Sequence, residues 1–105
     1  MVFLMRCLHH PGKDADRDAH RAAHRDWVGT GGGGLASVLV GSALWGEAGA
    51  GIGNFGILEA TDEASARDFA EGDPFARAGI VRKIDLTRLA GGFQAHRITE
   101  RMTQE

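Results

Sequence analysis

Histidine and arginine side chains recur along a predicted helix between residues 13 and 29. His20 and His24 are four positions apart, and Arg17 and Arg21 have the same spacing. Because a helix turns once every 3.6 residues, the members of each pair lie on one side of it. An imidazole takes up and releases protons near neutral pH, and the planar guanidinium of arginine suits carboxylate-bearing ligands. The helix therefore carries groups suited to acid–base chemistry on a small anionic molecule.

The two histidines also have a spacing that suits a metal site, because a helix can present residues four apart to one ion. The residues between them are Arg-Ala-Ala, which differ from the Glu-x-x of zinc proteases. A third ligand would have to come from His9, His10 or His96, and none of these lies at a telling spacing. Metal binding stays an alternative, but we expect neither a metal nor another cofactor.

Apolar runs bounded by glycine, proline and polar residues predict the strands that support this helix. They cover residues 2–8, 35–45, 52–60 and 80–86. With one helix after the first strand and another after the third, the order is β-α-β-β-α-β. The sequence therefore predicts an α+β, ferredoxin-like fold, with a four-stranded antiparallel sheet and helices on one face.

The helix ends are predicted from capping residues and glycines. Asp14 or Asp16 is expected to cap the first helix, whose apolar face would comprise Ala19, Ala22, Ala23 and Trp27. Gly29 and the glycine run 31–34 are expected to end it. Thr61 or Asp62 would cap the second helix, which stops at Gly72. Asp73-Pro74 indicates the N-cap and first position of a further helical turn.

Composition restricts the class of protein and its partners. The 105 residues suffice for one domain, and a net charge of −2 with dispersed basic residues argues against nucleic-acid binding. The uncharged stretch 28–46 contains seven glycines, so we interpret it as a turn and a buried strand and expect no membrane segment. The single cysteine, Cys7, lies in a predicted strand, is expected to be buried, and is typical of a reducing compartment. We therefore expect a cytoplasmic protein.

Two segments resemble motifs of the YciI-like (YCII-related) family. Residues 21–28, Arg-Ala-Ala-His-Arg-Asp-Trp-Val, resemble its first-helix motif R-x-x-H-x-x-x-[LV]. Residues 72–80, Gly-Asp-Pro-Phe-Ala-Arg-Ala-Gly-Ile, resemble its signature D-P-[FY]-x-x-[AG]-G-[LIV]. The match covers about residues 2–88. One departure is that the second strand of the family usually ends in Gly-Pro, whereas here it ends in Gly41-Ser42.

The resemblance implies a homodimer of the dimeric α/β-barrel type, in which two four-stranded sheets meet face to face. It also implies a cleft that holds His24 and Asp73. We therefore predict a small-molecule enzyme of lyase, isomerase or hydrolase type, in which His24 transfers the proton and Asp73 orients its ring. Arg21 and Arg17 are predicted to bind the substrate, and Ser42 to donate a hydrogen bond into the cleft.

Plainer interpretations of the same residues stay open. Asp73 would also serve simply as a cap for the turn at Pro74, with His24 half-buried beside Trp27. The protein would then be a non-catalytic dimer that binds a small ligand or acts as an accessory subunit. The polar tail, residues 90–105, is predicted to be either a helix packed on the partner subunit or partly disordered.

Overall fold

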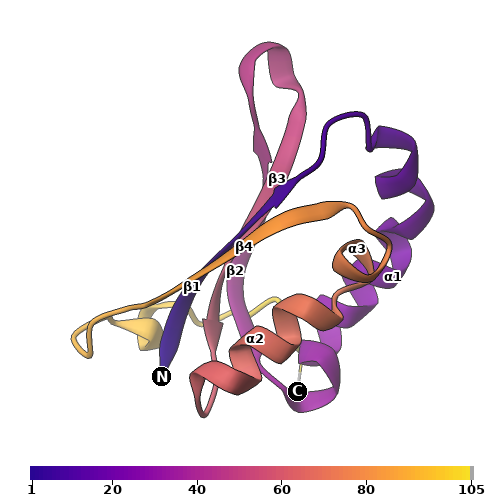
Figure 1. Ribbon diagram of the computed structural model, residues 1–105. Coiled ribbons are helices and arrows are strands. Elements are labelled where there is room, and N and C mark those ends of the chain that lie inside the picture. The colour runs from indigo at the N-terminus through magenta and orange to yellow at the C-terminus, as the bar shows by residue number, and fades with distance from the viewer. Residues whose placement is uncertain (105) are drawn as a thin grey trace.

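Four strands form one antiparallel sheet in the computed structural model, which describes residues 1–104 (Figure 1). The strands are β1 (Val2–His9), β2 (Ser37–Trp45), β3 (Gly51–Glu59) and β4 (Val81–Arg88). They pair in the order β2-β3-β1-β4, and every neighbouring pair is antiparallel. With the helices between them, this arrangement confirms the predicted ferredoxin-like order.

The α-helices cover one face of the sheet (Figure 1). They are α1 (Asp14–Gly34), α2 (Glu63–Gly72) and α3 (Pro74–Arg77), and the short 3-10 turns η1 (Glu47–Gly49) and η2 (Ala95–Arg97) lie in connections. None of the helices within residues 1–104 is long and apolar enough to cross a lipid bilayer. Because the helices cover one face of the sheet, side chains of helices and strands meet on that face.

The start of α1 differs from the prediction, whereas the start of α2 agrees with it. Asp62 Oδ1 accepts a hydrogen bond from the backbone N of Ser65 at 2.8 Å and caps α2. Neither Asp14 nor Asp16 caps α1, whose N-cap residue is Lys13 without a side-chain bond. Both carboxylates lie in the first turn of α1 and pair with basic side chains there. Ion pairing has displaced capping at this helix end, although acidic groups still complement the helix dipole.

The face of α1 that meets the sheet is also different from the predicted one. Ala19, Ala22 and Ala23 are exposed, whereas Arg17 is buried and His24 is partly buried. Of the predicted apolar face only Trp27 points inward, where its Nε1 donates to the carbonyl oxygen of Phe69 at 3.0 Å. Alanines offer little area to bury, so a helix whose inner face lines a cavity can leave them in water. The predicted alanine face was therefore wrong.

The core lies between the sheet and the helices. Phe3, Met5 and Cys7 alternate along β1 toward the helices and meet Leu58 of β3 and Phe69 of α2. Burial raises the pKa of the Cys7 thiol to about 12, and the carboxylates of Asp73 and Asp85 add to the effect. As expected, Cys7 is a buried side chain, and it carries no thiolate near neutral pH.

The sheet lacks side chains at one position beneath α1. Gly41 of β2 pairs with Gly56 of β3, so two neighbouring strands present only backbone there. Because neither glycine fills the space between sheet and helix, a hollow remains below the middle of α1.

Within the described residues 90–104, the tail forms only the short turn η2 and no long helix. After η2 it runs along the edge strand β2, where the backbone N of Thr103 donates to the carbonyl oxygen of Val38 at 3.1 Å. The Thr103 hydroxyl also donates to the carbonyl oxygen of Val28 at 2.8 Å and accepts from Val38 N at 2.7 Å. An edge strand offers unpaired backbone groups, and here the tail of the same chain takes some of them. The tail thereby ties the end of α1 to β2.

Candidate active site

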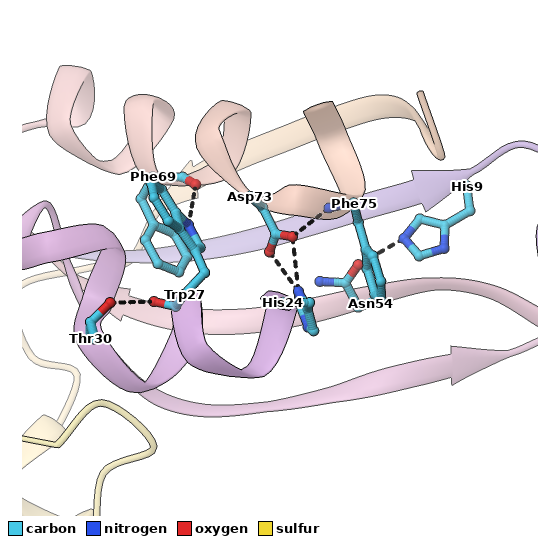
Figure 2. Close-up of polar contacts among 8 residues, drawn as sticks. All are labelled: His9, His24, Trp27, Thr30, Asn54, Phe69, Asp73 and Phe75. Carbon is cyan, nitrogen blue, oxygen red and sulfur yellow. Dashed lines mark hydrogen bonds and ion pairs between the residues drawn. The ribbon is translucent and has the colours of Figure 1, made fainter. Parts of the chain in front are cut away.

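The imidazole of His24 and the carboxylate of Asp73 are in direct contact, as Figure 2 shows. His24 Nδ1 lies 2.7 Å from Oδ2 and 2.9 Å from Oδ1 of Asp73. An ionised carboxylate only accepts hydrogen bonds, so Nδ1 carries the proton of the neutral ring. The other nitrogen, Nε2, then presents its lone pair on the side of the ring away from Asp73. This is the arrangement of a positioned general base.

Asp73 makes this contact while it also caps α3. Its Oδ1 accepts from the backbone N of Phe75 at 2.8 Å, and Pro74 occupies the first position of the helix. Capping and contact with His24 are therefore compatible roles of one carboxylate, not alternatives. The double contact holds Asp73 in one orientation, with only 9% of its side chain exposed.

Two aromatic contacts set the position of the His24 ring. The Phe75 ring stacks on it with a centroid distance of 4.2 Å and an interplanar angle of 6°. One turn further along α1, Trp27 lies against Gly72, where a Cβ atom would come within 2.7 Å of the indole. The absence of a side chain at Gly72 lets α1 approach the α2–α3 junction, which brings His24 to Asp73.

His24 and Asp73 form part of the wall of a cavity of about 380 Å³ between α1 and the sheet. A volume of this size is typical of sites for small organic molecules. The cavity wall contains every site residue predicted from the sequence: Arg17, Arg21, His24, Ser42 and Asp73. The structure thus brings these five residues together around one hollow.

The three predicted polar residues other than the pair differ in what they contact. Arg17 is buried, its Nη2 pairs with Asp14, and its Nη1 lies 3.3 Å from His9 Nδ1. Arg21 is partly exposed and pairs with Asp18 on the outer side of α1. Ser42 is exposed at the rim, and its hydroxyl donates to the neighbouring carbonyl of residue 43 at 2.9 Å. Arg21 and Ser42 therefore face both solvent and cavity, whereas Arg17 is held inside.

His9 and Asn54 belong to the same region but were not predicted as site residues. His9 Nε2 lies 2.9 Å from Asn54 Oδ1 (Figure 2), and His9 is only 6% exposed. Burial lowers the pKa of His9, and the positive charge of Arg17 lowers it further. Asn54 lies on the cavity wall, and so does Arg25 of α1.

The model of the YCII-related domain family matches residues 1–90. The chain belongs to this family. The match covers most of the chain and confirms the resemblance given by the two sequence motifs.

A solved structure supports the same conclusion for this YCII-related domain. The similar structure is that of 5-chloro-2-hydroxyhydroquinone dehydrochlorinase from Burkholderia phenoliruptrix in complex with 2,5-dihydroxybenzoquinone. The two chains share 28% sequence identity with a TM-score of 0.74, over 88% of this chain and 96% of the other. No curated protein sequence matches the chain significantly. The structural neighbour is thus an enzyme that binds a small cyclic molecule.

The residues that sequence analysis missed in this YCII-related domain did carry a signal. His9 continues the alternation of Phe3, Met5 and Cys7, so period two directs its side chain to the helical face. Asn54 is a polar residue in the middle of a predicted strand, paired with Cys7 on one side. A buried amide and a buried imidazole need hydrogen-bond partners, and that need indicates a contact between them.

Across residues 1–104, three or more His, Cys, Asp or Glu side chains nowhere gather closely enough to hold a metal ion. His20 and His24 therefore lack a third side chain of these types in the part of the chain that the structure describes. The groups that do gather at the cavity are a His–Asp pair, arginines and an amide.

Proposed function

We propose that this YCII-related domain is a small-molecule enzyme of lyase type that uses His24 and Asp73 for general acid–base catalysis. The observation that carries the proposal is the contact of His24 Nδ1 with both Asp73 oxygens on the cavity wall. It leaves Nε2 free to act on a molecule in the cavity. The lyase type is supported by the similar structure, which is a dehydrochlorinase.

The proposed reaction is a proton removal coupled to loss of a leaving group. His24 Nε2 takes a proton from a hydroxyl group or a carbon of the substrate. The electron pair of the broken bond forms a new double bond, and the leaving group departs with its own bonding pair, as chloride would. Asp73 stabilises the imidazolium that results, and His24 then returns the proton to water. The sum is one unsaturated product, the anion and a proton.

The proposed substrate is a small hydroxylated ring with acidic oxygen atoms. Arg21 at the mouth and Arg17 further inside would favour phenolate or enolate oxygens, because arginine is always protonated. Ser42 at the rim would donate to the same molecule. A ring of the size of the neighbour's ligand, 2,5-dihydroxybenzoquinone, is compatible with a cavity of about 380 Å³.

Release of chloride from chlorinated hydroxyhydroquinones tests this function. The protein is incubated with these compounds without oxygen, and chloride is measured by ion chromatography. We expect catalytic chloride release that saturates with substrate concentration. Binding without any release above the rate in buffer would contradict the enzyme proposal and favour the non-catalytic ligand-binding alternative.

We further propose a cytoplasmic homodimer in which the open faces of two sheets meet. Leu4 is 39% exposed on the face of β1 away from the helices, and it pairs with Ile57 of β3. Exposed apolar side chains on an uncovered sheet face are typical of an interface. The reducing compartment is supported by a lone cysteine. Sedimentation velocity is expected to give twice the mass of the chain, and a monomer at micromolar concentration would refute the dimer.

A further inference from the structure

Asn54 on β3 lies on the wall of the same cavity as the proposed catalytic histidine, His24. Figure 2 shows the side-chain oxygen of Asn54 facing His9, with its nitrogen on the side away from His9. We propose that Asn54 is a substrate-binding residue whose Nδ2–H groups donate to an oxygen atom of the ring, and that His9 is a positioning residue that fixes this amide. This inference rests on the proposed function and names the group that recognises the substrate oxygen.

The donors and acceptors along this contact chain determine which way the amide points. Arg17 has only donors, so His9 Nδ1, 3.3 Å from Arg17 Nη1, must accept. The neutral ring then carries its hydrogen on Nε2, which donates to the atom 2.9 Å away on Asn54. That atom must be the amide oxygen. The two hydrogens on Nδ2 consequently face the other way.

Burial makes this orientation permanent in the folded protein. His9 and Arg17 are 6% and 8% exposed, and Asp14 balances the charge of Arg17. Because burial and the Arg17 charge lower the pKa of His9, the ring stays neutral and keeps the same donor and acceptor around neutral pH. The Phe75 ring, which stacks on His24, also meets His9 edge-on with a centroid distance of 5.7 Å. The Phe75 ring therefore contacts both imidazoles and helps to fix their positions.

The Nδ2 group has its hydrogens available for a ligand. Within residues 1–104 Asn54 Nδ2 makes no hydrogen bond, whereas every fully buried side-chain nitrogen or oxygen has a partner. Nδ2 is therefore not sealed in the protein but open to the cavity. A neutral donor near the base suits an oxygen that gains negative charge when His24 removes a proton. This points to a carbonyl, phenolate or enolate oxygen of a cyclic substrate.

Binding of 2,5-dihydroxybenzoquinone to Asn54→Asp tests the assignment. Aspartate keeps an oxygen for His9 Nε2–H and nearly the same shape, but it replaces the donor by a second acceptor. We expect the Kd, measured by calorimetry, to rise at least about tenfold. The reason is that an acceptor oxygen of the aspartate would then face an acceptor oxygen of the ligand. Unfolding in urea verifies that the variant is folded.

The positioning role of His9 is tested by a pair of substitutions. His9→Gln keeps one donor and one acceptor, and we expect it to retain most of the affinity. His9→Leu removes both, and we expect a several-fold rise in Kd and KM with kcat little changed. His10→Leu, at an exposed position next in sequence, is the matched control for hydrophobic substitution. Equal effects of His9→Gln and His9→Leu would refute the hydrogen-bond role.

A measurement on the unaltered protein complements the variants. The side-chain amide signal of Asn54 in a ¹⁵N–¹H spectrum is assigned by its absence in Asn54→Asp, and we expect it to shift when the quinone is added. An unshifted signal, an unchanged Kd in Asn54→Asp, or no binding by the wild-type protein would each overturn the inference. If binding depends on Asn54 but no chloride is released, the inference stands and the proposed elimination is wrong. If Asn54→Asp releases chloride with unchanged KM, the proposed elimination stands and the inference on Asn54 is wrong.

Discussion

Replacing His24 by glutamine should lower kcat for chloride release by about 10²- to 10⁴-fold, the usual contribution of a positioned general base. Glutamine can still donate a hydrogen bond to Asp73, but its amide has no basic lone pair at neutral pH. The side chain of His24 is 19% exposed and lies at the cavity wall, so the fold should persist. Chloride release by the variant at the wild-type rate would remove His24 from the mechanism.

The role of Asp73 in catalysis can be separated from its role as a cap. Asp73→Asn keeps an oxygen that can accept from the backbone N of Phe75, but it removes the charge that stabilises the imidazolium. We expect a large loss of kcat with little loss of stability. Asp62→Asn is the matched control, because Asp62 caps α2 in the same way and contacts no histidine. If both variants lose activity equally, the effect is not specific to the pair.

Replacing Gly31 by alanine should remove about 3–5 kcal/mol from the free energy of unfolding, the range of severe backbone and packing defects. Gly31 has φ of +63°, a conformation that disfavours side chains. A Cβ atom there would also lie 1.9 Å from the carbonyl oxygen of Ala36 and 3.2 Å from Thr103. The turn from α1 to β2 would have to open, because the carbonyl oxygen of Gly31 accepts from Leu35 N at 2.9 Å and Ala36 N at 3.2 Å.

Gly33→Ala provides the control for the prediction on Gly31→Ala. Gly33 has φ of +76°, but a Cβ atom there would meet nothing within 4 Å. We expect this variant to lose only about 1 kcal/mol, the cost of the left-handed conformation alone. Urea unfolding, monitored by tryptophan fluorescence, measures the free energy of unfolding of both variants. Similar losses in the two variants would show that the clash with Ala36 does not govern the stability of the turn.

The capping positions show how far local sequence signals reach. At Asp62 and Asp73 the cap acts on a backbone group two or three residues away, and both contacts form as the sequence indicates. At Asp14 and Asp16 the same residue type is taken by Arg17 and Lys13 instead. Where a carboxylate can bond either a backbone N–H group or a basic side chain, the two partners compete. Sequence spacing alone does not predict which of them it bonds.

The orientation of α1 shows where sequence periodicity is insufficient. A helix with alanines on one side and arginines on the other predicts that the alanines are buried. Here the opposite holds because the arginine side lines a cavity, in which polar groups remain hydrated or paired. The glycine pair 41 and 56 and the approach of α1 to Gly72 contribute to that cavity, and both depend on packing between distant segments.

Apolar runs, glycines and short motifs were enough to predict the order of strands and helices, the family, and His24 and Asp73 as a candidate pair. The folded structure was needed to show that His24 contacts Asp73, that Arg17 is buried against His9, and that Asn54 lies on the wall of the same cavity. These contacts could not be predicted, because each depends on which groups meet after distant strands and helices have packed.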